Sequence, residues 1–569
     1  MDLSFPGSTT ENQSPLFAPL TPVFSDNVLD VLGVSTFHKS PSAIFTVNST
    51  ADVVDDSDGV TTLREAINQA NADDGQDLIV FERSLFSNAQ TITLSLGELD
   101  ITHNLDIIAP RDLLTGGNLV TVSGNNASRV FEIETGASVN LSGLIIADGS
   151  VTGDNGAGIK NSGNLTLDNS IVRNNSAFSI LVPAYKSYTL SAGLGGGIYN
   201  YRGNLEVNNS TIIGNSARDG GGIYNELGIS TVNNSTINGN SAKYNGGGIT
   251  NYGTGTVNNS TITGNSAGAS GGGIRTSNSI VMFSKTGEQL NRTSMVVSNS
   301  TITGNSAKAS DGGGICNQFG DTTLTVSNST INGNSAGGKG GGIYNDNDFG
   351  SGNSNSNNTV SNSTINGNSA GDKGGGIYNG GPGTLEKDNT SITVNNSTVS
   401  GNTAGNNGGG IYNNHALTLL FSTITLNQAA DGGGVFNSLY PTPYTTTIPT
   451  GVATVHNTII AANTPTAKGV NRDVAGPFTS NGYNLIGDST GSTGFGSTGD
   501  IVGTSDNPID PRLAVLDFNG GSTATHALFP DSPAIDAADP TVLDTDPTTD
   551  QRGKPRVSSS TDIGAFEFA

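Results

Sequence analysis

The chain has 569 residues with 80 glycines, 13% charged residues and a net charge of −24. This composition differs from that of an ordinary globular enzyme and from that of a disordered tail, and the negative charge argues against nucleic acid or an anionic membrane as a partner. The sequence has no apolar run of about 18 residues that would predict membrane insertion, and its single cysteine, Cys316, excludes a disulfide framework.

Residues 1–43 contain several prolines and no clear periodicity, so we expect an extended N-terminal segment. Its start, Met1-Asp2-Leu3, has neither the basic region nor the apolar stretch of a secretion signal. If the chain is exported, the sequence does not show by which route.

Residues 44–150 contain the one pattern that favours a helix. Thr62 and Glu65 match a capping box, and the apolar residues that follow fall on one helical face, namely Leu63, Ala66, Ile67 and Ala70. We expect this helix to cover the N-terminal end of the fold and to belong to a cap with the first turns of the repeat structure.

Residues 151–465 repeat one pattern, Asn-Ser-Thr-Ile, Gly-Asn-Ser-Ala and Gly-Gly-Gly-Ile-Tyr-Asn, and the isoleucines Ile212, Ile237 and Ile262 are 25 residues apart. Three short alternating stretches in each repeat predict strands. Leucine-rich repeats have a similar period but need Leu at most core positions, and these repeats have almost none. The sequence therefore predicts an all-β fold, a right-handed parallel β-helix with three short strands in each rung.

Two sets of residues that recur from repeat to repeat have a structural explanation. We expect the isoleucines Ile198, Ile223, Ile249 and Ile274 to point into the core, and the triple glycines to form tight corners. A recurring asparagine predicts an internal ladder in which each amide bonds to the next rung, at Asn215, Asn240, Asn265, Asn305, Asn334, Asn368 and Asn402.

The residue after each core isoleucine should face solvent by strand alternation. Most of these residues are aromatic, and they form the candidate ligand-binding stripe Tyr199, Tyr224, Tyr344, Tyr378, Tyr412 and Phe436, interrupted by Thr250, Arg275 and Cys316. Such a stripe either stabilises the sheet or offers a platform for sugar rings or a partner surface. Insertions at 275–296, 346–358, 380–391 and 438–453 all follow the same strand, so we expect them at one corner beside the stripe.

Candidate catalytic and metal-binding residues are sparse. A polysaccharide hydrolase or lyase needs clustered carboxylates, yet between residues 195 and 440 no two adjacent repeats share an acid, and Asp346 and Asp348 lie in a loop-like segment. Asp55 to Gly59 resembles a calcium loop, but Val54 occupies its first ligand position, so we assign no cofactor and leave calcium unsupported. The five histidines lack metal-ligand spacing.

Residues 466–569 form the C-terminal region. Its dense charged group, Asp536, Asp550, Arg552, Asp562 and Glu567, predicts an ion-pair network that closes the C-terminal end, with a ligand site as the less favoured alternative.

Three segments resemble known bacterial families. Phe45 to Asp52 with Thr61 to Asn68 resembles the CSLREA element of bacterial surface proteins, with Thr61 and Thr62 in place of its Cys and Ser. The repeats, with Ile212 to Asn215 and Gly220 to Ile223, look like those of polymorphic outer-membrane proteins, with Ile in place of Phe. The C-terminal motifs are similar to choice-of-anchor Q domains: Asp510-Pro511-Arg512-Leu513, Thr525-His526-Ala527-Leu528, Ser532 to Asp536, Asp550 to Gly553 and Asp562 to Glu567.

These resemblances imply an exported protein of pectin-lyase-like fold, without implying pectin cleavage. We therefore expect an extracellular or cell-surface adhesin or structural protein without catalysis, with carbohydrate or a cell-surface component as its partner. The alternatives are a polysaccharide-active enzyme with a site built from loops, and a self-associating fibre subunit. The sequence ends two residues after Glu567, and the proteins with choice-of-anchor Q domains that it resembles often carry a sorting segment after this block.

Overall fold

The computed structural model describes residues 41–55, 57–184, 187–278, 293–346, 356–380, 390–438, 451–466, 471–541, 547–557 and 560–568. A compact unit begins at Pro41, so almost all of the predicted extended segment lies outside the described residues, as do most residues of the four insertions. Hydrogen-bonded rungs continue on both sides of residue 150, and our domain boundaries at 150 and 465 stay predictions.

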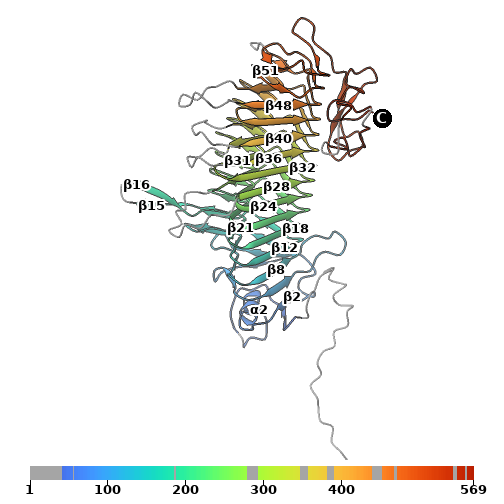
Figure 1. Ribbon diagram of the computed structural model, residues 1–569. Coiled ribbons are helices and arrows are strands. Elements are labelled where there is room, and N and C mark those ends of the chain that lie inside the picture. The colour runs from blue at the N-terminus through green and yellow to red at the C-terminus, as the bar shows by residue number, and fades with distance from the viewer. Residues whose placement is uncertain are drawn as a thin grey trace, which may run out of the picture. The chain divides into compact units, whose positions relative to one another are not determined.

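The unit is a parallel β-helix, as predicted. In one rung β31 (Ile315–Gln318), β32 (Thr322–Ser327), β33 (Thr330–Asn332) and β34 (Ser335–Ala336) follow one another. Each pairs in parallel with its counterpart one rung later, namely β35 (Ile343–Asp346), β36 (Asn357–Ser361), β37 (Thr364–Asn366) and β38 (Ser369–Ala370). Figure 1 shows these strands stacked along the unit. The two-residue Ser-Ala strand was not predicted because it is too short to show alternation.

The rungs form three long parallel sheets of 27, 15 and 11 strands. The 27-stranded sheet contains two strands from most rungs. One of the two carries the predicted aromatic stripe and the positions aligned with it in other rungs. These strands are β4 (Leu99–Ile101), β7 (Phe131–Ile133), β11 (Ile159–Asn161), β17 (Ile198–Tyr201), β21 (Ile223–Asn233), β24 (Ile249–Asn258), β27 (Ile274–Ser277), β31, β35, β39 (Ile377–Asn379), β43 (Ile411–Asn413), β47 (Val435–Asn437) and β51 (Val474–Pro477).

The 15-stranded sheet contains one three-residue strand from each repeat. Its central members are β13 (Ile171–Arg173), β19 (Thr211–Ile213), β22 (Thr236–Asn238), β25 (Thr261–Thr263), β29 (Thr301–Thr303), β33, β37, β41 (Thr398–Ser400), β45 (Thr423–Thr425) and β49 (Ile459–Ala461). The 11-stranded sheet begins with β10 (Ser150–Thr152), β14 (Ser176–Phe178), β20 (Ser216–Ala217), β23 (Ser241–Ala242) and β26 (Ser266–Ala267).

The recurring asparagine and glycine residues form the corners of each rung. Asn209, Gly214 and Gly220 have φ values of 50°, 65° and 67°, a left-handed conformation that Gly and Asn tolerate best. Only the first glycine of each triple has this conformation. The third is small for another reason: a Cβ at Gly222 would lie 2.6 Å from the carbonyl oxygen of Gly248 in the next rung.

Side chains inside the β-helix are apolar or hydrogen-bonded. The predicted core isoleucines are buried, and the predicted asparagine ladder is present: both the backbone N–H and the side-chain amide of Asn215 donate to Oδ1 of Asn240 at 3.0 Å. The ladder extends from Asn175 to Asn463 and ends on the carboxylate of Asp473, which accepts both Asn463 donors at 2.8 Å.

Two further ladders run through the rungs. The asparagines of the Ile-Tyr-Asn stretches bond to one another, with Asn345 donating to Oδ1 of Asn379 at 2.8 Å. The serines of Asn-Ser-Thr form the second, in which the backbone N–H of Ser210 donates to Oγ of Ser235 at 3.0 Å. The repeated Asn-Ser-Thr motif therefore has a structural reason, because its serine is buried.

The N-terminal end is covered by the predicted helix, α2 (Leu63–Ala70), which packs against β1 (Ile44–Val47), β2 (Asp77–Phe81) and β4. Its capping box is formed, with the Thr62 N–H donating to Oε2 of Glu65 at 2.8 Å. Within the described residues no helix has the length and apolar character needed to span a membrane.

The first part of the C-terminal region continues the rungs, since β51 and β53 (Leu485–Ile486) pair with the last strands of the long sheets. The described residues from Asp510 onward lie beside the 15-stranded sheet (Figure 1). The predicted charged group belongs to this second part and does not close the end of the β-helix, which corrects our prediction. The hairpin of β56 (Leu513–Asp517) and β57 (Thr525–Leu528) and the segments that follow contact β37, β41 and β45. Apolar contact centres on Phe421 and Ile459, which pack with Leu528 and Ile563. The reason is that Phe421 and Ile459 replace the polar residues of earlier repeats on the outer face.

Candidate functional site

The predicted stripe belongs to one column of outward-pointing residues. Strand register aligns them in successive rungs and extends the column toward the N-terminus beyond Tyr199, in the order Asp100, Glu132, Lys160, Tyr199, Tyr224, Thr250, Arg275, Cys316, Tyr344, Tyr378, Tyr412 and Phe436. The column has four parts: a charged part, an aromatic stack, an interruption and a second aromatic stack.

The second stack is the more regular. The rings of Tyr344, Tyr378, Tyr412 and Phe436 lie parallel within 8°, with centroids 5.0, 5.1 and 5.5 Å apart. The ammonium groups of Lys339 and Lys373 each lie 4.9 Å from a ring centroid, above Tyr378 and Tyr412. Both arrangements stabilise the stack, through aromatic contact and through cation–π attraction.

These tyrosines are not exposed, and here our prediction was wrong. Tyr199, Tyr224, Tyr344, Tyr378 and Tyr412 expose only 4 to 8% of their surface, and Phe436 is partly buried. Alternation does place them outside the core, but each ring covers the next. The glycine corner also folds back against them, since a Cβ at Gly340 would lie 2.7 Å from that of Tyr344. Ligand binding by this stripe stays a prediction. The exposed ring faces on which we based it are absent from these five tyrosines.

The first stack contains Tyr199, Tyr224 and Tyr252, with centroids 5.8 and 5.5 Å apart. The Tyr199 hydroxyl donates to Oε2 of Glu226 at 2.6 Å. Burial, together with this carboxylate, raises the pKa of Tyr199 well above its usual range, so the phenol stays protonated.

Thr250, Arg275 and Cys316 interrupt the two stacks and are all buried. The guanidinium of Arg275 bonds to the Tyr252 hydroxyl, and with the Gln318 amide oxygen turned toward it, that oxygen accepts two further bonds at 2.9 Å. Burial raises the pKa of the Cys316 thiol, which makes it a poor nucleophile.

The charged part is a cluster that our sequence analysis missed. The Arg129 guanidinium, 2% exposed, lies 2.5 Å from carboxylate oxygens of Glu98 and Glu132 and also bonds to Asp154. Lys160 bonds to the other Glu132 oxygen at 2.6 Å. Burial raises the pKa of the Glu98 carboxyl; Arg129 opposes this shift and Glu132 adds to it. Of these residues the sequence pattern signals Glu132 alone, an acid between two core residues in Phe131-Glu132-Ile133, as Asp100 is in Leu99-Asp100-Ile101.

The other sequence candidates lie apart from this column or have local roles. Asp346 accepts the Tyr344 hydroxyl at 2.5 Å, and Asp348 lies outside the described residues. Asp55 accepts the N–H and hydroxyl of Ser57, as in an ordinary turn, and Asp56 is likewise not described. Over the described ranges no group of three or more His, Cys, Asp or Glu side chains could hold a metal ion.

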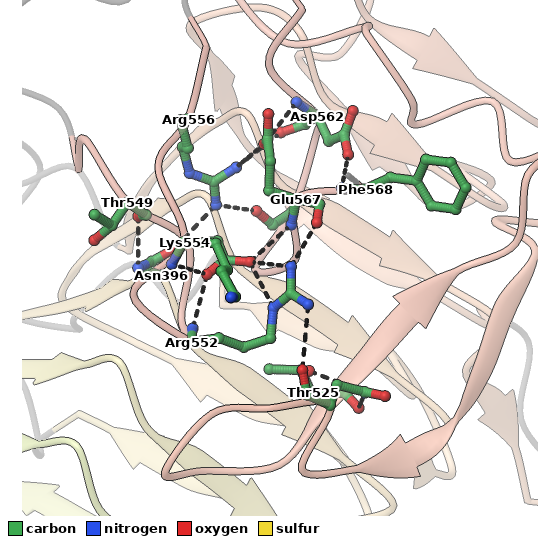
Figure 2. Close-up of polar contacts among 12 residues, drawn as sticks. Asn396, Thr525, Thr549, Arg552, Lys554, Arg556, Asp562, Glu567 and Phe568 are labelled. Carbon is green, nitrogen blue, oxygen red and sulfur yellow. Dashed lines mark hydrogen bonds and ion pairs between the residues drawn. The ribbon is translucent and has the colours of Figure 1, made fainter.

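The C-terminal charged group forms an ion-pair network (Figure 2). Arg556 bonds to Glu567 at 3.0 Å and to Oδ1 of Asn396 on the β-helix, and Arg552 bonds to the buried Asp550 at 2.7 Å. Asp536 contributes its backbone N–H to Asp562. Burial raises the pKa of Glu567 to about 7, with repulsion from Asp562 opposed by Arg556. The predicted network therefore joins this region to the side of the β-helix.

Comparison with known proteins gives a family match and a structural likeness. The Chlamydia polymorphic membrane protein repeat matches residues 328–346, which lie within one repeat of this chain. The crystal structure of pectate lyase Pel9A is similar, with a TM-score of 0.34 and 12% identity over 94% of this chain and 98% of that chain. No curated protein matches the chain. The resemblance of the repeats to polymorphic membrane protein repeats is thus confirmed for that segment, and the CSLREA and choice-of-anchor Q resemblances stay predictions.

Proposed function

We propose that this chain is an extracellular or cell-surface β-helix protein that acts as an adhesin or structural surface component. The polymorphic membrane protein repeat supports a surface role. The observation that carries the proposal is the position of the insertions: four leave the rungs at one corner, after β27, β35, β39 and β47. In β21 and β24 the same corner is crossed by a continuous strand. Repeat proteins that bind partners vary one face in this way while the core keeps its register.

Two measurements test this proposal. Labelled antibodies against the native protein should decorate intact cells or extracellular material, and staining only after permeabilisation would contradict it. A variant in which the insertions at 380–391 and 438–453 are replaced by the short connection of β24 should lose binding to cells and keep its circular dichroism spectrum. Unchanged binding would remove this corner from the proposal.

A polysaccharide-active enzyme is the second candidate, and the cluster around Arg129 is the observation in its favour. Glu98 and Glu132 share one guanidinium donor, and the raised pKa of Glu98 is what a general acid needs. Against this, Arg129 already bonds to both carboxylates, which is typical of a structural ion-pair cluster. We expect purified protein to release no reducing ends from acidic or neutral polysaccharides. Release that disappears in both Glu98→Gln and Glu132→Gln would favour the enzyme.

A further inference from the structure

A surface pocket of about 350 Å³ lies on the 11-stranded sheet, whose strands precede the glycine corner and the aromatic column in each rung. It crosses three successive rungs, because β14, β20 and β23 are paired in register there. Its volume falls within the range of roughly 300 to 1,000 Å³ that small-ligand sites have.

An exposed aromatic ring forms one side of the pocket. Phe178 exposes 53% of its surface, whereas the stripe tyrosines expose 8% or less. Phe178 therefore offers what the stripe does not, an aromatic face open to a ligand. Such a face gives a sugar ring a large apolar contact at small entropic cost, since the side chain has two rotatable bonds.

Positive charge lies on the next two rungs. Arg218 and Lys243 line the pocket beside Phe178, and no acidic residue is among its described lining residues. Lys243 is exposed and has no carboxylate partner within 4 Å in the described part of the chain, while Arg218 bonds to Asp219 at 2.8 Å. Arg218 is thus already compensated by its neighbour, and Lys243 supplies the positive charge available to a ligand. In a chain with a net charge of −24, a pocket with such a cation and no acid in its described lining is complementary to an anionic ligand.

Hydroxyl groups complete the lining. Ser179, Ser216 and Ser241 belong to the same pocket, and none of the three side chains is buried. An aromatic face, cations and several hydroxyls are together the groups that a sugar carrying a carboxylate would engage. We propose that this pocket binds a uronic acid unit of an acidic polysaccharide, with the sugar ring on Phe178 and its carboxylate at Lys243. The site deepens the proposed surface function, on which it rests, by naming the ligand class.

The test is titration calorimetry of the full chain with hexasaccharides of galacturonic acid and of hyaluronan, with the hexamer of N-acetylglucosamine as the uncharged probe. We expect binding of at least one acidic hexasaccharide and at least tenfold weaker binding of the uncharged one. Lys243→Gln and Phe178→Ala should each weaken binding about ten- to a hundredfold, since a charge-assisted bond or an aromatic contact is lost.

Matched controls lie outside the pocket. Lys308→Gln removes another exposed lysine from the position after a Ser-Ala strand two rungs beyond Lys243, and Phe518→Ala removes a ring that is 59% exposed on the C-terminal region. Both should bind as the wild type does. Failure of both acidic probes to bind, or equal losses in pocket and control variants, would overturn the inference. Surface staining of cells is measured separately, so its outcome distinguishes failure of this site from failure of the proposed function.

Discussion

Tyr378 packs between two parallel rings, with the centroid of Tyr344 at 5.0 Å on one side and that of Tyr412 at 5.1 Å on the other. A Lys339 ammonium lies 4.9 Å from its centroid. A residue outside the core thus has the surroundings of a core residue. Strand alternation correctly predicts the direction of such a side chain, but it does not predict burial, which depends on the neighbours in adjacent rungs and on the corner that folds over them.

Replacing Tyr378 with serine should therefore destabilise the protein. The variant loses two ring contacts and leaves a cavity in the stack, for an expected cost of about 2 to 4 kcal/mol. Tyr201→Ser is the control, because Tyr201 is 36% exposed. Chemical denaturation of the two variants measures the difference. Equal midpoints would mean that the stack contributes little to stability and would restore the case for a binding platform.

Asp473 ends the asparagine ladder with an ionisable group. Burial raises its pKa to about 6, although hydrogen bonds from Asn463 and from the N–H of Asp488 favour the carboxylate. Between its unfolded pKa of 3.8 and this value the folded protein binds more protons than the unfolded chain. The unfolding free energy should therefore be highest below about pH 4 for this group and fall as the pH rises toward about 6.

Asp473→Asn tests this pH dependence. The variant has no titrating group at the end of the ladder, so its unfolding free energy should fall less steeply than that of the wild type between pH 4 and pH 6. Glu567, whose pKa is raised to about 7, leaves a residual slope in both proteins. Parallel curves for wild type and variant over this range would show that Asp473 does not titrate as inferred.

At the scale of the strand and its ladder, the periodicity of the sequence predicted those features that depend on residues within one repeat or on their copies in the next. The isoleucine core, the Asn215 ladder and the α2 cap follow from residues whose partners are their own copies or near neighbours. The other two ladders escaped prediction because Asn345 and Ser210 have side chains that are equally suited to solvent. The docking of the C-terminal region was not predicted either. It depends on contact between Phe421 and Ile563, which are far apart in sequence, so no local pattern indicates it.

The asparagine ladder makes a quantitative prediction. Asn265 accepts two bonds from Asn240 and donates to Asn305 and to the carbonyl of Ile237. Asn265→Leu should cost about 1 to 3 kcal/mol for each buried group left without a partner. Asn238→Leu is the matched control, since Asn238 is partly exposed on the outer face of the 15-stranded sheet. If both variants melt at the same temperature, the ladder does not stabilise the fold.

Over the whole molecule, rungs contact mainly their neighbours, so stability approximates a sum of rung and interface contributions and local defects matter. The rung that contains β27 lacks three of the interactions that join other rungs. Thr276 stands where neighbouring rungs have Asn251 and Asn317, so the second asparagine ladder is broken. Thr276 Oγ1, Thr293 Oγ1 and Asn317 Oδ1 are buried without a hydrogen-bond partner within the described residues. The aromatic stack is interrupted in the same place by Arg275.

We therefore expect opening of the β-helix to begin at this rung, and Thr276→Asn to repair it. Asn occupies the same position in the rungs before and after, so the new amide has a partner on each side: it can accept from Asn251 and donate to Oδ1 of Asn317. The gain should be about 1 kcal/mol in unfolding free energy, with slower amide hydrogen exchange in β27 and β31. Thr236→Asn, on the outer face of β22, should change neither quantity. Faster exchange in the Thr276 variant would contradict this prediction. It would mean that the larger Asn side chain does not fit at this position and that the packing of threonine stabilises the rung more than the new hydrogen bonds do.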